Sequence, residues 1–148
     1  MYLIDGNNLM GHTGSRANRP SEMDRQSVLN RVADFLEKTG RKAILVFDGS
    51  RSPLRKTSRV HLEFAGPRQK ADDVIRHQIE HSRSRKDLIV VSSDNGIYGY
   101  ARSCGVRALK CHEFNRLLQE TPEKNVDENR HIPVADTKEW LRYFGEEE

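Results

Sequence analysis

Cysteine is scarce in this sequence, and long apolar runs are missing. The 148 residues include two cysteines, Cys104 and Cys111. Two cysteines give neither a disulfide framework nor the ligand ladder of a structural zinc site, so we expect a reducing, cytoplasmic setting. No apolar stretch approaches membrane-spanning length, and no signal peptide is expected ahead of the first apolar residues. These features predict an ordinary globular domain without a membrane partner.

A large excess of one charge is also missing. The net charge is +3, with 35% hydrophobic and 32% charged residues, which leaves enough apolar material for a packed core. The basic residues are concentrated in residues 51–70, where six of them accompany one acid, Glu63: Arg51, Arg55, Lys56, Arg59, Arg68 and Lys70. A mildly basic chain with such a segment fits a polyanionic partner.

Apolar strands alternate with helical patterns along residues 1–120. The predicted strands are residues 2–5, 43–47, 60–64, 87–92 and 106–109. The predicted helices are residues 21–39, 72–84, 94–104 and 112–120, and Gly6-Asn7-Asn8 is expected only to end the first strand. This alternation predicts an α/β fold with a mainly parallel sheet. Residues 121–148 are expected to form a polar linker and a C-terminal helix near residues 137–144.

Five aspartates follow strands or begin helices in this pattern. They are Asp5, Asp48, Asp72, Asp73 and Asp94. Each alone has a structural explanation, since aspartate is common at helix N-caps and in Asp-Gly turns. Together they should meet beyond the carboxyl ends of the strands, where α/β folds place their ligands. Gathered carboxylates repel one another, so the sequence predicts a site for Mg²⁺ or Mn²⁺.

Four motifs give this chain a family resemblance. They are Ile4-Asp5-Gly6-Asn7-Asn8-Leu9, Val46-Phe47-Asp48-Gly49, Lys70-Ala71-Asp72-Asp73-Val74-Ile75 and Val91-Ser92-Ser93-Asp94, in this order. Over residues 1–120 the chain resembles the YacP-like group of NYN domains, a branch of the PIN-like nucleases. The resemblance implies a three-layer α/β/α sandwich and metal-dependent endonucleolytic cleavage of RNA.

The resemblance also implies roles for individual residues. Asp5, Asp73 and Asp94 match the core metal-binding and catalytic acids, Asp72 an accessory acid and Asp48 a less uniform acidic position. Asn8 matches an asparagine that would orient Asp5 or touch the substrate phosphate. Two departures matter: flap-type nucleases carry an acid where this chain has Lys70, which argues against flap DNA cleavage, and Asn95-Gly96 leaves the fourth metal ligand open.

Basic loops supply the candidate substrate-binding residues. The loop after Asp48 should overhang the same sheet edge as the acids, and Lys70 precedes Asp72. Phosphate contacts are therefore expected from Arg16, Arg19, Arg51, Arg55, Lys56, Arg59 and Lys70. The alternative is that these loops are simply solvated. Tyr98 and Tyr100 could stack a base, although filling the helix–sheet interface is the commoner use of such residues.

Three other functions stay open at the level of sequence. The same fold could serve as a non-catalytic RNA-binding or ribosome-associated module. A phosphoacceptor domain would use strand-end aspartates and a late lysine, for which Lys110 is the candidate. His77-Gln78-Ile79-Glu80-His81 spells the inverted zinc-protease motif, but an exposed helix surface is the simpler explanation. The RNA, the cleavage sequence and the oligomeric state, including a homodimer through the tail, are left open.

Overall fold

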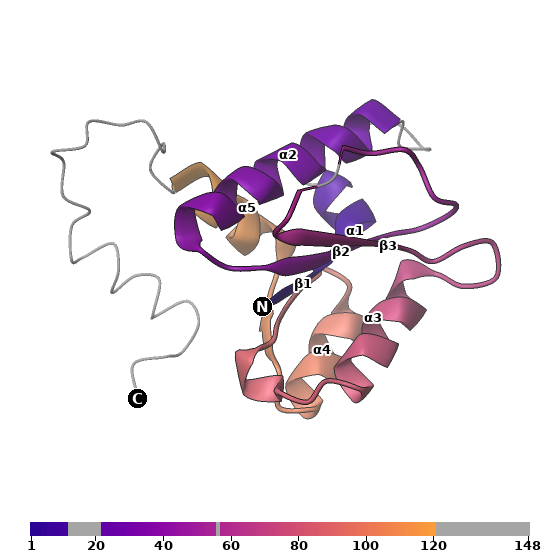
Figure 1. The fold of residues 1–148 in the computed structure, drawn as a ribbon. Coiled ribbons are helices and arrows are strands. Elements are labelled where there is room, and N and C mark those ends of the chain that lie inside the picture. Colours follow the sequence, from indigo (N-terminus) through magenta and orange to yellow (C-terminus); the bar gives the residue numbers. More distant parts are fainter. Residues whose placement is uncertain (12–21, 56, 121–148) are drawn as a thin grey trace, which may run out of the picture.

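A five-stranded, wholly parallel sheet forms the centre of the protein (Figure 1). The computed structural model describes residues 1–11, 22–55 and 57–120. In these residues the strands are β1 (Tyr2–Asp5), β2 (Ala43–Phe47), β3 (Val60–Phe64), β4 (Ile89–Val91) and β5 (Arg107–Leu109). Their order in the sheet is β3-β2-β1-β4-β5, so β1 is central and β3 lies at an edge as its alternating sequence predicts.

Helices cover both faces of this sheet. The helices are α1 (Gly6–Gly11), α2 (Glu22–Thr39), α3 (Ala71–Glu80), α4 (Asn95–Ser103) and α5 (Cys111–Glu120), and a 3₁₀ turn spans Arg85–Asp87. Figure 1 shows α1, α2 and α5 on one side of the strands and α3 and α4 on the other. The predicted three-layer α/β/α sandwich is therefore confirmed.

The alternation of side chains along β1 divides the core into two halves. Tyr2 and Ile4 pack on the side of α2 and α5, where Tyr2, Phe35 and Phe114 form an aromatic cluster with ring centroids 5.2 to 5.7 Å apart. Leu3 packs on the side of α3 and α4 with Ile75 and Ile97. Burial on both faces explains why the central strands are continuously apolar.

Short helix α1 differs from the prediction that Gly6-Asn7-Asn8 only ends the first strand. A Cβ built on Gly6 would lie 2.6 Å from Cε1 of Phe47 and 2.8 Å from the carbonyl oxygen of Val46. The absence of a side chain at Gly6 therefore lets the chain turn from β1 into a helix against the end of β2. Leu9 and Met10 then bury their side chains in the core.

Several element boundaries also moved. Strand β4 is Ile89–Val91, shorter than the predicted residues 87–92, because residues 85–87 form the 3₁₀ turn. Helix α3 ends at Glu80 and not near residue 84. The predicted 121–148 linker and helix lie outside the described residues, as do residues 12–21. No helix in the described part of the chain is long and apolar enough to cross a membrane.

Candidate active site

The acids converge because three neighbouring parallel strands end at one edge of the sheet. Strand β1 ends at Asp5, β2 runs directly into Asp48, and β4 is followed by Ser92, Ser93 and Asp94. Since β2 and β4 flank β1 in parallel register, the segments that follow them lie on either side of Asp5. This edge is where open α/β sheets hold their ligands.

Asp5 is the buried centre of the site. Only 6% of the surface of Asp5 is exposed. Its Oδ1 accepts a hydrogen bond from the backbone N–H of Asn8 at 3.3 Å, and its Oδ2 accepts one from Oγ of Ser92 at 3.2 Å. Burial raises the pKa of Asp5 to about 6, against the opposing effect of these two hydrogen bonds, and the nearby charges of Asp48 and Asp72 add to the rise. The surroundings of Asp5 therefore disfavour its negative charge, although the fold places two further carboxylates nearby. Such a strongly perturbed group is common in functional sites.

Ser92 connects Asp5 to Asp94. The Ser92 hydroxyl donates to Asp5 and accepts the backbone N–H of Asp94 at 3.1 Å. Asp94 itself is exposed and caps α4, since its Oδ1 accepts the backbone N–H of Ile97 at 3.1 Å. Ser92 was not among the candidate site residues, and the structure gives it a positioning role beside Asp5.

Asn7 and Asn8 fix the two loops that flank Asp5. The side-chain oxygen of Asn7 accepts the backbone N–H of Asp48 at 2.7 Å, on the β2 side. The side-chain oxygen of Asn8 accepts the backbone N–H of Ser93 at 2.7 Å, on the β4 side, and lies 3.3 Å from Sγ of Cys111. Burial raises the pKa of the Cys111 thiol to about 11, so it stays neutral beside Asn8. Asn8 thus orients Asp5 through its backbone and braces a loop with its side chain.

Asp48 is attached to two helices. Its Oδ1 accepts the backbone N–H of Ala71 at 2.6 Å, at the start of α3. Its carbonyl oxygen accepts Nη2 of Arg25 at 2.6 Å, and Arg25 also donates to the carbonyl of Ser50 and to the hydroxyl of Ser52. The Arg25 guanidinium lies 5.3 Å from the ring centroid of Phe47.

Arg25 was not among the residues predicted from the sequence. The helical spacing could have identified Arg25, because it lies three and four residues before Val28 and Leu29 and so beside the buried face of α2. A basic residue on such a stripe needs partners, and the partners here are the carbonyl groups and the serine of the loop after β2. Arg25 therefore shapes the loop that carries Arg51.

Asp72 and Asp73 have different surroundings. Asp72 is half-buried, and its charge lies near enough to Asp5 to add to the rise in the pKa of that carboxyl. Asp73 is exposed, and its Oδ2 accepts the backbone N–H of Lys70 at 3.0 Å, as in a capping box at the start of α3. The structure thus brings together Asp5, Asp48 and Asp72, and it places Asp73 on the helix cap.

The candidate phosphate-binding residues do not all reach the acids. Arg51 is exposed in the loop after β2, Arg55 is exposed with its backbone N–H bound to Oε1 of Gln26, and Lys70 directly precedes α3. Arg59 precedes β3 and therefore lies at the amino ends of the parallel strands, opposite to the acids. There its Nε is 3.5 Å from Oε2 of Glu37. The expectation that Arg59 overhangs the acids thus fails for a topological reason. Arg16, Arg19 and Lys56 lie outside the described residues.

Lys110 and Tyr98 form a second contact beside α4. Nζ of Lys110 donates to Oδ1 of Asn95 at 2.7 Å and lies 4.1 Å from the ring centroid of Tyr98. Tyr98 and Tyr100 are both half-buried at the surface of α4. The engagement of Lys110 with Asn95 and Tyr98 gives no support to the phosphoacceptor alternative.

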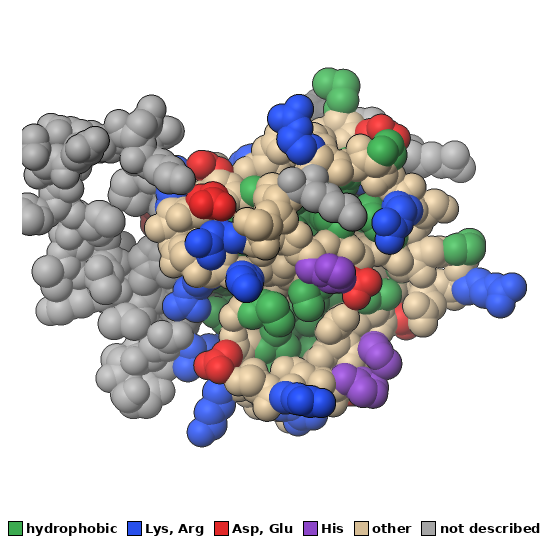
Figure 2. Space-filling view, viewed as in Figure 1, with side chains coloured by type: hydrophobic (Ala, Val, Ile, Leu, Met, Phe, Trp, Pro, Cys, Tyr) green, Lys and Arg blue, Asp and Glu red, His purple; other side chains and the backbone are tan. Residues whose placement is uncertain are grey.

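Two other features lie away from the acids. The His77 and His81 rings are 4.1 Å apart on the exposed side of α3, and Nδ1 of His81 is hydrogen-bonded to the carbonyl of His77, which fits the helix-surface explanation of the H-x-x-E-H motif. A hollow of about 270 Å³ lies near the amino ends of the strands, lined in part by Leu3, Ile44 and Leu88. Figure 2 shows apolar side chains gathered in a hollow on this face. This hollow is mainly apolar and lies at the opposite ends of the strands from the aspartates.

The chemistry of the donors suits a hard divalent cation. Carboxylate oxygens are the ligands that Mg²⁺ and Mn²⁺ prefer, and the charges of Asp48 and Asp72 raise the cost of ionising Asp5, which a cation would relieve. Within residues 1–11, 22–55 and 57–120, however, no three His, Cys, Asp or Glu side chains are already arranged to hold a metal ion. The outer carboxylates instead accept backbone N–H groups.

Comparison with known proteins agrees with this architecture. Residues 2–143 match the family model described as the YacP-like NYN domain. No curated protein sequence matches the chain.

Solved structures resemble the chain over nearly its whole length. The crystal structure of Rae1 (YacP) from Bacillus subtilis has a TM-score of 0.69 at 18% identity and covers 96% of this chain and 79% of its own. The W164L mutant of the same protein has a TM-score of 0.68 at 19% identity and covers 99% of this chain and 84% of its own. At these identities the likeness concerns the fold.

Proposed function

Because the chain belongs to the YacP-like NYN domain family, a nuclease-type domain of the PIN-like superfamily, we propose that it is a divalent-metal-dependent endoribonuclease. It would hydrolyse RNA phosphodiester bonds at the carboxyl edge of the sheet. One observation carries the proposal: Asp5 is buried at the end of the central strand, where its pKa is raised to about 6 by burial and by Asp48 and Asp72. Such a site favours a bound divalent cation, which can activate a water molecule for phosphodiester hydrolysis.

The residues that would hold Mg²⁺ or Mn²⁺ are Asp5, Asp72 and Asp94, with Asp48 beside them. The family resemblance alone put Asp73 in the core and Asp72 in support. The surroundings of the two side chains favour exchanging these roles, since Asp72 acts on Asp5 and Asp73 caps α3. When bound, the metal would activate a water molecule and stabilise the leaving oxygen.

The protein's own contribution is to position the carboxylates. Asn8 and Ser92 hold the two oxygens of Asp5, and Ser92 also holds the backbone of Asp94. Arg51 and Lys70 are exposed next to the acids and would contact phosphates on either side of the cleaved bond. RNA as the substrate, association with the ribosome and a cytoplasmic location are parts of this proposal.

A second candidate is a non-catalytic RNA-binding or ribosome-associated module. The observation that favours it is the engagement of the outer carboxylates with backbone N–H groups: Asp48 with Ala71, Asp73 with Lys70 and Asp94 with Ile97. In this alternative the acids serve mainly as helix caps and turn residues, and the basic surface alone binds RNA.

A cleavage assay with a matched pair of aspartate variants separates the two. Structured and single-stranded RNA would be incubated with the protein in Mg²⁺, Mn²⁺ or EDTA, beside Asp5→Asn, Asp72→Asn and Asp73→Asn. We expect cleavage in metal only, a loss of at least about 100-fold in Asp5→Asn and Asp72→Asn, and cleavage within a few-fold of wild type in Asp73→Asn. RNA binding without cleavage under every metal condition would favour the second candidate. Loss in Asp73→Asn but not in Asp72→Asn would restore the roles that the resemblance implies.

A further inference from the structure

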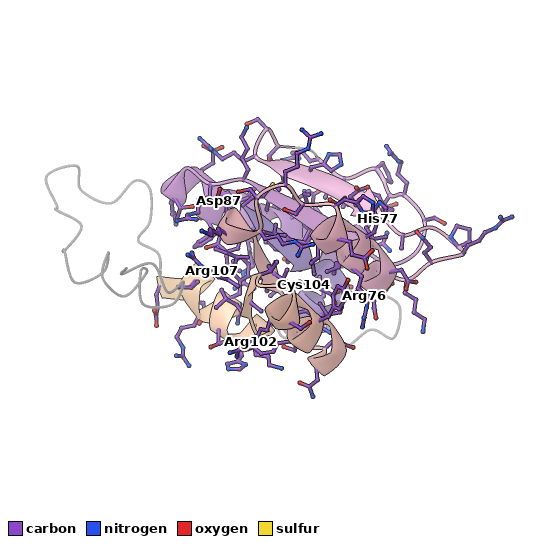
Figure 3. The ribbon with its side chains drawn as sticks, turned by 90° about the horizontal axis from the view of Figure 1, so that it is seen from below. Arg76, His77, Asp87, Arg102, Cys104 and Arg107 are labelled. Atoms are coloured by element: carbon purple, nitrogen blue, oxygen red, sulfur yellow. The ribbon has the colours of Figure 1, made fainter. Side chains whose placement is uncertain are left out.

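Arg76 lies among the acids, although neither the family motifs nor the basic loops draw attention to it. It follows Asp72 by one turn of α3, and its Nε is 3.9 Å from Oδ2 of Asp72. Figure 3 shows Arg76 where α3 faces α4. Its side chain is 38% exposed, so the guanidinium can be reached from solvent at the acidic edge.

Two neighbours hold the Arg76 guanidinium in place. Its central carbon lies 5.1 Å from the ring centroid of Tyr100, within the range of a cation–π contact. The hydroxyl of Tyr100 donates to Oε2 of Glu80 at 2.6 Å. Because Glu80 follows Arg76 by one turn of α3, the ring is anchored to the helix that carries the arginine. This anchoring reduces the freedom that Arg76 would lose on binding a ligand.

Gly96 leaves the space that Arg76 occupies. A Cβ built on Gly96 would lie 3.2 Å from Nη2 of Arg76 and 3.0 Å from Oδ1 of Asp94. The Arg76 guanidinium and the Asp94 carboxylate therefore both border the space that a side chain at position 96 would fill. Arg76 therefore reaches from Asp72 on α3 toward Asp94 at the start of α4.

We propose that Arg76 forms a phosphate-binding subsite for the RNA strand between Asp72 and Asp94, an inference that rests on the proposed function. A guanidinium presents its donors in a planar fork that matches two phosphate oxygens. Its contact with Asp72 is too long for a hydrogen bond, so this pairing leaves donors for a substrate. The subsite binds the phosphate at the cleaved bond or next to it, because Asp72 and Asp94 are two of the proposed metal ligands.

The competing explanation is that Arg76 is only a counter-ion for the acids. A counter-ion would lower the repulsion between Asp72 and Asp94 without touching RNA. Its removal would change the stability of the fold but leave the number of phosphate contacts unchanged. The salt dependence of RNA binding distinguishes the two, because each lost phosphate contact on a single strand lowers the slope of log K against log salt by about 0.7.

The test uses the full chain and a fluorescein-labelled single-stranded RNA, with Asp5→Asn as the background, because this variant is expected to lose cleavage. Binding is followed by fluorescence anisotropy over a range of salt concentrations for Arg76→Gln, Arg76→Lys and a control, Arg83→Gln. Arg83 is an exposed arginine beyond the other end of α3, next to the apolar hollow. We expect Arg76→Gln to weaken binding about tenfold at low salt and to lower the slope by about 0.7. Arg76→Lys should keep the slope, and Arg83→Gln should match the background.

Gly96→Ala keeps Arg76 but crowds its guanidinium, so it should also weaken binding if the subsite exists. This variant decides the matter if Arg76→Gln does not fold. A slope for Arg76→Gln equal to that of Arg83→Gln, or undiminished binding in a folded Gly96→Ala, overturns the subsite. If the wild type never cuts but the slope change persists, the nuclease proposal fails and the subsite stands. If the wild type cuts and the slope does not change, only the subsite fails.

Discussion

Replacing Asp5 by asparagine should stabilise the fold at neutral pH and weaken it in acid. The pKa of Asp5 rises from 3.8 to about 6 on folding, chiefly through burial. Between these values the folded chain binds more protons than the unfolded chain. The stability contributed by the neutral carboxyl is therefore complete below about pH 4 and is lost as the pH rises through about 6. An asparagine side chain cannot ionise, so the Asp5→Asn variant should lack this pH dependence.

The magnitude follows from the size of the shift. A rise from 3.8 to about 6 corresponds to roughly 3 kcal/mol between the two charge states of Asp5. An amide has one acceptor oxygen where the carboxylate accepts from both Asn8 and Ser92, and loss of one such bond costs about 1 kcal/mol. Asp5→Asn should then gain about 2 kcal/mol at pH 8 and lose about 1 kcal/mol at pH 4.

Urea denaturation in EDTA at pH 4 and pH 8 measures both values, with Asp34→Asn as a control on the exposed face of α2. Addition of Mg²⁺ at pH 8 should stabilise the wild type by mass action and stabilise Asp5→Asn less. The reasoning is refuted if Asp5→Asn changes the free energy of unfolding by the same amount at both pH values. It is also refuted if the exposed control reproduces the reversal of sign.

Two further substitutions probe the supports of the site. Asn8→Ala should lower the free energy of unfolding by about 1–3 kcal/mol in chemical denaturation, because the Ser93 N–H loses its acceptor. The control is Asn115→Ala, which loses a side-chain hydrogen bond from Arg31 away from the acids. An equally small effect in both variants would contradict the bracing role of Asn8. Arg25→Met should release the loop after β2, lower the free energy of unfolding by about 1–3 kcal/mol and increase cleavage by trypsin at Arg51. An unchanged cleavage pattern would show that the loop holds its shape without Arg25.

The sheet could be predicted from the sequence because burial on both faces requires unbroken apolar strands. Ala43–Phe47 and the residues around Ile89–Val91 have no polar alternation, as strands covered on both faces of a parallel sheet require. Once the strands are parallel, their carboxyl ends must share an edge. The convergence of Asp5, Asp48 and the residues after Val91 therefore follows from topology, without any knowledge of side-chain contacts.

The finer geometry could not be predicted because it depends on phase and on long-range contacts. Asp72 and Asp73 are adjacent at the start of a helix, and the helical rotation between them decides which one faces Asp5. That rotation is set by the burial of Ala71 and Ile75 on the sheet, which motif matching does not weigh. Arg59 lay in a loop expected beside the acids, but it directly precedes a parallel strand and so must lie at the far edge.

The consecutive residues Asp5-Gly6-Asn7-Asn8 act together as one positioning device. Gly6 permits the close turn against Phe47, and the next two side chains then diverge, with Asn7 reaching the loop after β2 and Asn8 the loop after β4. Because β1 lies between these two strands, one short segment fixes the backbone of both loops that carry neighbouring acids. Carboxylates that repel one another would otherwise push these loops apart, so the two asparagines stabilise the very arrangement that the charge of Asp5 and Asp48 opposes. The two neutral amides therefore hold the acidic edge together, beside Arg25 and the backbone N–H groups that donate to the carboxylates.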